Sequence, residues 1–303
     1  MSQKERLNIA VIIPSLEKYG GAERYLIECV REWQRRHDIT IYATKINETL
    51  LKEHGITEQV KRYQLREYFE GENGLVLNTV LLPKIWRGEI GVHDLYHTHL
   101  WPTHLIDLHP MVWFPHEPLR LLHDLRYEQN VQVLGDTAVR NLHIYPKYNY
   151  DRIGDALFEA SMSAIDAIDK TSRPDCIVAN SQYTAKYLEK VYGQPVKKVV
   201  YPGVESEVFI ELPSDQSLFV TISQLWPHKR VNLLIEAIAL VDNAQLIVIG
   251  SGPEKDYLVE MACKLGVEDR VFFLSGLSNA DLRLILARAY AFFFFHPLKN
   301  PSA

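Results

Sequence analysis

The chain has 303 residues, which is enough for two domains with separate cores. Its 47% hydrophobic and 23% charged residues are typical of a globular protein. The net charge of −5 comes without a long basic run, which argues against a general nucleic-acid-binding protein.

The cysteines and the apolar runs give no sign of an exported or membrane-spanning protein. Cys29, Cys176 and Cys263 lie far apart, so we expect neither a disulfide framework nor a structural zinc site. No apolar run approaches the roughly 20 residues that cross a bilayer. The first run, 7–13, is too short for a signal peptide. We therefore expect a cytoplasmic location.

Apolar, β-branched runs alternate with helix-period segments in the first two thirds of the chain. The pattern predicts a strand at 7–13 and a helix at 22–34. A later helix, from Gln182 to about Val191, begins after the N-cap pair Asn180-Ser181 and is closed by Gly193. The other strands expected here are Ile39–Ala43, Leu95–His99, Met111–Phe114, Cys176–Ala179 and the shorter Val199–Tyr201.

The segment 205–217 loses this periodicity, and we place a boundary in it between domains 1–207 and 208–303. Two successive strand-helix series predict an α/β protein with two Rossmann-like domains that face each other across a cleft. The second series comprises strands Leu218–Ile222, Gln245–Ile249, Val271–Leu274 and Ala291–Phe295, and helices Lys229–Leu240, Pro253–Leu265 and Asn279–Ala289.

The last strand, which contains Phe292–Phe295, is predicted to be buried, yet only 296–303 follow it. A buried parallel strand needs cover on both faces. We therefore expect the second domain to be incomplete.

A basic turn follows the strand 218–222. Lys229 and Arg230 are predicted to begin a helix, where backbone N–H groups already favour an anion. Gln224 lies at the carboxyl end of the strand, which is where open α/β sheets bind ligands. These residues predict a phosphate or diphosphate site, although paired basic residues also occur on solvated surfaces.

Two glycine pairs also follow strands, Gly20-Gly21 and Gly250-x-Gly252. Glycine lets the backbone approach a ligand closely, but either pair also fits a tight turn that binds nothing. Neither pair completes the G-x-G-x-x-G pattern, since Lys255 stands at the third glycine position. This counts against a nicotinamide or flavin enzyme.

Histidines cluster in the first domain. His97 and His99 share one face at a strand end, and His116 follows the next strand. Their spacing is a weak metal signal. We expect His99 and His116 to line the cleft, and the others, including His104 and His109, to be surface or packing residues. His116 could hydrogen-bond a substrate hydroxyl, carry a proton or be structural.

In their order along the chain, these motifs resemble the retaining glycosyltransferases of family 4, which have the GT-B fold. The resemblance implies that the N-terminal domain binds a sugar or glycan acceptor and the C-terminal domain a nucleotide sugar, without metal or cofactor. The matching segments are 20–24, His116-Glu117, Asn180-Ser181, 201–204 with Phe209, 229–231, 250–254 and 273–277.

The resemblance also implies roles for single residues. His116 and Lys229 would take part in catalysis, His116 at the donor sugar and Lys229 at the diphosphate. Gln224 stands where the family commonly has Arg, and Arg230 is the nearby cation that could compensate. The implied donor-binding residues are Gly20, Gly21, Gln224, Lys229, Arg230, Gly250, Gly252 and Leu277.

We therefore expect a metal-independent enzyme that transfers a hexose from a nucleotide-diphosphate sugar to an acceptor with retention of configuration. The chain ends before the family's Glu-x7-Glu motif, so we expect it to be weak or inactive on its own. The alternative is a non-catalytic nucleotide-sugar-binding or regulatory module of the same fold. No nucleic-acid partner is expected, membrane association lacks support in the sequence, and the acceptor stays open.

Overall fold

The computed structural model describes residues 6–70, 74–118, 152–203, 212–226 and 229–294. Contacts divide the chain into two compact units, unit 1 (Met1–Pro202) and unit 2 (Gly203–Ala303), and each is described by itself. The predicted boundary at 207/208 falls in 204–211, outside the described residues.

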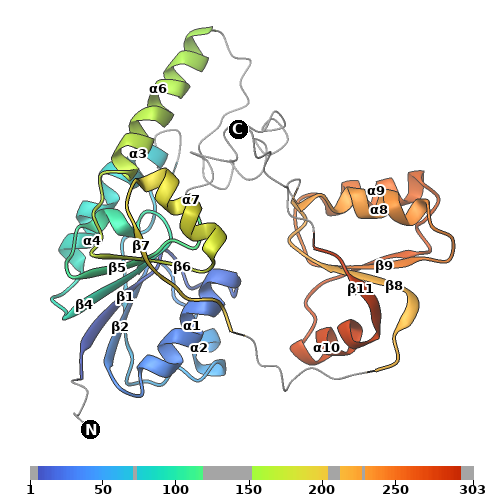
Figure 1. Ribbon diagram of the computed structural model, residues 1–303, viewed down its shortest axis with the longest axis horizontal. Helices are drawn as coiled ribbons and strands as arrows, with labels where there is room; N and C mark the ends of the chain where they lie inside the picture. Colours follow the sequence, from blue (N-terminus) through green and yellow to red (C-terminus); the bar gives the residue numbers. More distant parts are fainter. Residues whose placement is uncertain (1–5, 71–73, 119–151, 204–211, 227–228, 295–303) are drawn as a thin grey trace. The chain divides into compact units, whose positions relative to one another are not determined.

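Unit 1 is built on a seven-stranded parallel sheet with strand order β3-β2-β1-β4-β5-β6-β7 (Figure 1). Its strands are β1 (Asn8–Ile12), β2 (Asp38–Ala43), β3 (Lys61–Gln64), β4 (Leu95–His99), β5 (Met111–Phe114), β6 (Cys176–Ala179) and β7 (Val196–Val199). Its helices are α1 (Gly21–Trp33), α2 (Glu48–Glu53), α3 (Gly74–Val80), α4 (Leu82–Glu89), the 3-10 helix η1 (Thr103–Ile106), α6 (Arg152–Asp169) and α7 (Gln182–Tyr192).

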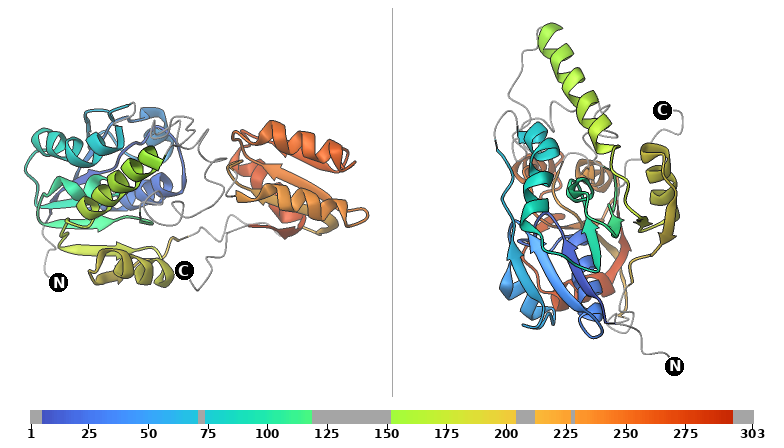
Figure 2. Two further views of the ribbon diagram at one scale, coloured as in Figure 1. Left: turned by 90° about the horizontal axis from the view of Figure 1, so that it is seen from above. Right: turned by 90° about the vertical axis from the view of Figure 1, so that its left-hand side faces the viewer.

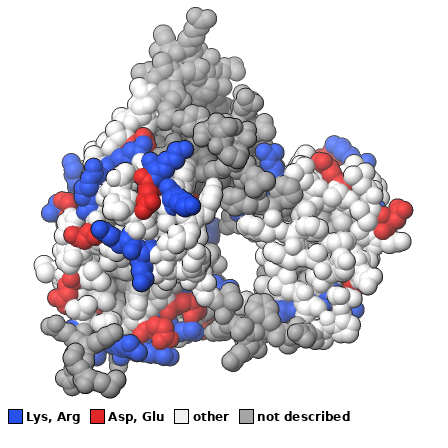
Figure 3. Space-filling model, viewed as in Figure 1, with Lys and Arg blue, Asp and Glu red and all other residues white. Residues whose placement is uncertain are grey.

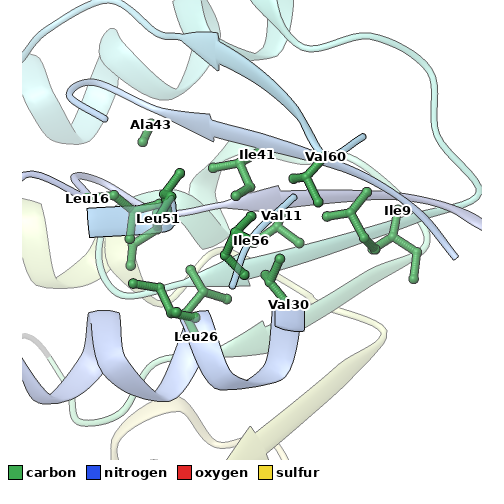
Figure 4. Close-up of a cluster of buried hydrophobic side chains, with 13 residues drawn as sticks. Ile9, Val11, Leu16, Leu26, Val30, Ile41, Ala43, Leu51, Ile56 and Val60 are labelled. Carbon is green, nitrogen blue, oxygen red and sulfur yellow. The ribbon is translucent and has the colours of Figure 1, made fainter. Parts of the chain in front are cut away.

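Helices cover both faces of this sheet because successive strand residues point to opposite sides. Ile9 and Val11 of β1 pack with Leu26 and Val30 of α1 in one buried cluster, which also includes side chains of β2 and α2 (Figure 4). Ala10, the residue between them on β1, joins a second buried cluster with residues of α4 and η1 on the other face.

Unit 2 is a four-stranded parallel sheet in the order β10-β9-β8-β11. Helices α8 and α9 lie on one face and α10 on the other (Figures 1 and 2). The first pair buries Leu234, Ile235 and Leu258, whereas α10 has no buried residue. The elements are β8 (Asp215–Ile222), α8 (Val231–Ala239), β9 (Gln245–Ile249), α9 (Lys255–Lys264), β10 (Val271–Leu274), α10 (Asn279–Arg288) and β11 (Ala289–Phe292).

Several predicted elements have other bounds in the structure, and for three of them the physical cause is clear. Strand β7 spans Val196–Val199 rather than the predicted 199–201. It is an edge strand, and its two lysines interrupt the apolar pattern by which a strand is predicted. Helix α8 starts at Val231 rather than Lys229, since Arg230 has a left-handed backbone, with φ of 54°. Strand β11 spans 289–292 rather than 291–295, and Phe295 lies outside the described residues.

The prediction that Phe292–Phe295 is a buried strand is wrong for the residues that the structure describes. Phe292, Phe293 and Phe294 are 47%, 41% and 61% exposed. The reason is that, among the described residues, β11 pairs only with β8, and α10 on this side of the sheet has no buried residue.

The described helices are all too short or too polar to cross a membrane.

Candidate functional site

The strand order places a switch point in each sheet. In unit 1 the order reverses between β1 and β4, and in unit 2 between β8 and β11. Loops that leave such neighbouring strands turn to opposite faces, which opens a crevice at the carboxyl ends where ligands bind. The residues that follow these four strands, and the strands next to them in each sheet, are therefore the candidate ligand-binding residues of each unit.

The Gly20-Gly21 turn follows β1 and leads into α1. Gly20 is the N-cap residue, and α1 has no side-chain cap there. A Cβ atom on Gly21 would meet nothing within 4 Å, and one on Gly20 would meet only the end of the Glu23 side chain, at 2.5 Å. Packing thus leaves space beside these glycines, at a helix end that attracts anions.

Three histidines lie together at the carboxyl ends of β4 and β5. The rings of His97 and His99 stack with centres 4.6 Å apart, which confirms that they share a face. His99 Nδ1 lies 3.3 Å from Nε2 of His116, two residues beyond β5. Tyr25 of α1 approaches the His116 ring edge-on at 5.5 Å and stacks on Phe114 at 4.6 Å.

The three imidazoles are neutral at pH 7. Burial lowers the pKa of His97 and of His116 to about 4, and lowers the pKa of His99 well below its usual range. His99 is 0% exposed, so the expectation that it lines an open cleft is wrong. His116 is partly buried.

His116 is fixed from the backbone as well as from its ring. Its φ of 63° is left-handed, and its carbonyl oxygen accepts a hydrogen bond of 3.1 Å from the Asn180 side chain. Asn180 follows β6, and the next residue, Ser181, caps α7 as predicted by accepting from the Thr184 N–H. The Asn180-Ser181 pair therefore joins the ends of β5 and β6.

In unit 2, Gly250 and Gly252 are required by the close approach of two backbone segments. Gly250 has φ of 152°, and a Cβ atom there would lie 1.9 Å from the Ser223 carbonyl oxygen. A Cβ atom on Gly252 would lie 2.5 Å from the Leu225 carbonyl oxygen. The loops after β8 and β9 are joined by backbone bonds such as Leu225 N–H to Ser251 O, at 2.9 Å. Packing alone thus explains these two glycines.

Lys229 belongs to the segment between β8 and α8, and its side chain approaches a residue that follows β11. Its backbone N–H donates to the Trp226 carbonyl oxygen at 2.9 Å, which closes the turn before α8. Its ammonium nitrogen lies 5.9 Å from the centre of the Phe294 ring, beyond β11. The cation is therefore at the carboxyl edge of the sheet, as predicted, and Lys229 stands two residues before the first residue of α8.

The two residues predicted to bind phosphate together with Lys229 have different surroundings. Gln224 is exposed after β8, whereas Arg230 is partly buried and its charge acts on Glu254. Burial raises the pKa of Glu254, and the positive charge of Arg230 opposes that rise. Part of the Arg230 charge is thus directed at a carboxylate of its own unit.

Leu277 follows β10 and is partly buried, directly after Gly276, which has φ of 68°.

Two further histidines of unit 1, His104 and His109, pack or pair with other partners. His104 is buried against Trp113, with ring centres 4.1 Å apart, and its Nε2 lies 2.9 Å from the Asp169 carboxylate. His109 pairs with Asp175 at 2.6 Å, which raises the pKa of the imidazole. Among the described residues, no group of three His, Cys, Asp or Glu side chains is arranged to hold a metal ion.

Sequence reasoning missed the contributions of Tyr25 and Glu254. Tyr25 lies on the face of α1 that covers the histidines, four residues before Cys29, a spacing that places both on one side of a helix. Glu254 was grouped with its glycine motif and given no role. Only the fold brings it near Arg230, from a different loop.

Charged side chains are distributed unevenly over unit 1. Exposed lysines gather over α7 and β7, and Lys and Arg side chains are prominent on this face (Figure 3). The four lysines of these two elements are Lys186, Lys190, Lys197 and Lys198. This area is small, and the absence of a nucleic-acid partner stays a prediction.

Two family profiles match the chain in succession. That of Glycosyltransferase Family 4 matches residues 19–208, more than half of the chain, and that of Glycosyl transferases group 1 matches residues 205–297.

Among curated proteins, a GDP-mannose-dependent alpha-(1-6)-phosphatidylinositol monomannoside mannosyltransferase of Mycolicibacterium smegmatis is 24% identical over 283 residues, covering 87% of this chain and 65% of the relative. The O-antigen chain mannosyltransferase RfbU of Salmonella typhimurium is 28% identical over 120 residues, covering 38% of this chain and 34% of that protein. The chain thus spans from about a third to about two thirds of the length of these relatives.

Solved structures share the fold. Anabaena HepE in complex with UDP-glucose has a TM-score of 0.63 at 19% identity, covering 93% of this chain and 72% of that one. The apo form of the lipopolysaccharide outer core galactosyltransferase WaaB has a TM-score of 0.57 at 15% identity, covering 94% and 73%. These matches confirm the predicted α/β fold with two Rossmann-like domains, the GT-B fold. Together with the match over residues 19–208, they show that the chain belongs to Glycosyltransferase Family 4.

Proposed function

We propose that the whole protein is a glycosyltransferase that transfers a hexose from a nucleotide-diphosphate sugar to a sugar or glycan acceptor. The observation that carries this proposal is the position of Lys229, near the carboxyl edge of the unit 2 sheet and two residues before α8 begins. A diphosphate is the ligand that such a cation and helix end would bind.

The chemistry follows from the charge that develops in the reaction. When the anomeric C–O bond breaks, negative charge moves onto the departing nucleoside diphosphate. A fixed cation and backbone N–H groups directed at that charge lower the barrier, and the loss of one such donor typically costs about 3–4 kcal/mol. Lys229 is suited to this role in unit 2, and the uncapped end of α1 at Gly20-Gly21 to a similar one in unit 1.

The two units would contact different parts of the donor. His116, neutral and fixed at the end of β5, is suited to hydrogen-bond the donor sugar. We propose retention of configuration by attack on the face from which the diphosphate leaves, with the leaving phosphate accepting the acceptor's proton. Catalysis without a metal is part of the same proposal, because Lys229 supplies the positive charge.

A product assay tests this function on the whole protein. Incubation with GDP-, UDP- and ADP-hexoses, GDP-mannose first because two relatives are named as mannosyltransferases, should release free sugar or a glycosylated acceptor. Proton NMR of the first-formed product should show the anomeric configuration of the donor. The opposite anomer would contradict retention, and failure to bind any of these donors would contradict the function.

A second candidate function is a nucleotide-sugar-binding or regulatory module that does not turn over its ligand. Two observations favour it: Gln224 supplies no charge, and Arg230 acts on Glu254. Donor binding without hydrolysis or transfer by the whole protein would support this module. Any turnover that a Lys229→Ala substitution abolishes would exclude it.

A further inference from the structure

His99 and His116 share a hydrogen bond that leaves a specific ring nitrogen available. The bond joins His99 Nδ1 and His116 Nε2 over 3.3 Å. The other nitrogen of His99, Nε2, is buried without a hydrogen-bond partner. The other nitrogen of His116, Nδ1, has no hydrogen-bond partner among the described residues and is not among the buried ones. It is the atom with which His116 can meet a ligand.

Because both rings are neutral, each carries one proton, and one ring must donate to the other. If His116 donated from Nε2, His99 would carry its own proton on Nε2, as a buried N–H group without an acceptor. If His99 donates from Nδ1, its buried Nε2 holds only a lone pair. Orphaned buried N–H groups are the rarer of the two in proteins. The second arrangement puts the proton of His116 on Nδ1.

We propose that His99 is a positioning residue that holds His116 as the neutral Nδ1–H tautomer, so that His116 donates a hydrogen bond to an oxygen of the bound sugar. The stack with His97 and the tilted contact with Phe114 fix the His99 ring in place. An Nδ1–H group cannot accept a proton at neutral pH. His116 is therefore a hydrogen-bond donor to the sugar and not a general base, and this role rests on the proposed function.

Nitrogen-15 NMR of the intact chain tests the tautomer without any activity. Long-range proton–nitrogen correlations show which ring nitrogen carries the proton, and a His116→Gln variant identifies the His116 signals among those of the 12 histidines. We expect a protonated Nδ1 on His116 in the wild type. A protonated Nε2 on His116 would overturn the proposal, whether or not the protein is a transferase.

Two substitutions of His99 separate positioning from packing. His99→Asn keeps an amide N–H near the place of Nδ1, whereas His99→Leu keeps bulk and removes the donor. We expect His116 to stay in the Nδ1–H form in the first variant and to change to Nε2–H in the second. If His99→Leu does not fold, the wild-type tautomer and His99→Asn still decide the question.

Ligand binding supplies the functional readout. His99→Leu should weaken binding of the nucleotide sugar about tenfold, the worth of one hydrogen bond, and leave binding of the nucleoside diphosphate alone within twofold. His99→Asn should stay within threefold for both ligands. Equal weakening of both ligands by His99→Leu would mean that His99 only supports the fold, which overturns the proposal. A wild type that binds the nucleoside diphosphate but no sugar nucleotide would contradict both the role at the sugar and the proposed function.

Discussion

At the scale of single residues, the glycines of the two units have different reasons to be glycine. Gly250 has a left-handed φ of 152° and no room for a Cβ atom, whereas Gly21 has open space. We predict that Gly250→Ala lowers the free energy of unfolding by more than about 3 kcal/mol, because backbone must move to relieve the clash. Gly21→Ala should change it by less than about 0.5 kcal/mol. Urea unfolding followed by circular dichroism measures both, and equal effects would contradict this contrast.

The buried histidines make stability depend on pH in a defined window. The folded pKa of His97 and of His116 is about 4, below the value of roughly 6.5 in an unfolded chain. Between these values the unfolded chain binds protons that the folded chain does not. The free energy of unfolding should therefore fall as the pH drops from 6.5 to 4. His109, whose folded pKa is raised, has the opposite sign and acts above pH 6.5.

A variant checks that assignment. His116→Gln removes one of the titrating groups, so the slope of unfolding free energy against pH should become shallower between pH 4 and 6.5. The comparison uses urea midpoints measured at half-unit pH steps. An unchanged slope would mean that His116 titrates normally in the folded protein.

The location of a single residue could be predicted where it follows from the position of that residue relative to a strand. His116 and Lys229 could be placed at carboxyl edges because each lies in the segment that follows an apolar strand. The direction of Arg230 could not be predicted, because its left-handed backbone and the charge of Glu254 depend on a second loop. The burial of His99 also escaped prediction, since Phe114 and Tyr25 that enclose the cluster come from other elements.

At the scale of elements, two similar helix N-caps are expected to respond differently to the same Ser→Ala substitution. Ser181 and Ser278 each accept a bond of 3.1 Å from a backbone N–H three residues on. Helix α7 buries Ala185, Leu188 and Tyr192, whereas α10 has no buried residue.

Ser181→Ala should therefore cost about 1 kcal/mol of global stability. Ser278→Ala should mainly speed hydrogen exchange within α10, because a helix without buried side chains opens locally. Exchange measured by mass spectrometry distinguishes the two. Slower or unchanged exchange in α10 would contradict this expectation.

Four apolar strands were predicted to the residue, whereas a polar edge strand was missed. β5, β6, β9 and β10 match their predicted bounds because they are continuously apolar, as buried parallel strands are. β3, with the sequence KRYQ, gave no signal, since an edge strand carries charge without cost. The prediction that Phe292–Phe294 are buried failed because an apolar sequence does not ensure burial at the edge of a sheet, where these side chains are exposed.

At the scale of the whole molecule, the proposed mechanism neutralises the leaving diphosphate with protein cations and needs no metal. We predict that sugar transfer in EDTA stays within twofold of its rate with added Mg²⁺ or Mn²⁺. Chelator and metal titrations of the initial rate measure this. A loss of more than tenfold in EDTA that added metal restores would contradict metal independence.

The central claim, that Lys229 binds the donor diphosphate, is tested most directly by isothermal titration calorimetry with the nucleotide sugar that the wild type binds. Lys229→Ala should weaken binding by about 10- to 100-fold, the worth of a charged hydrogen bond. The matched control is Lys264→Ala, which removes an exposed lysine paired with Glu260 in the last turn of α9 and should stay within twofold. Equal affinities of the wild type and Lys229→Ala would contradict the account.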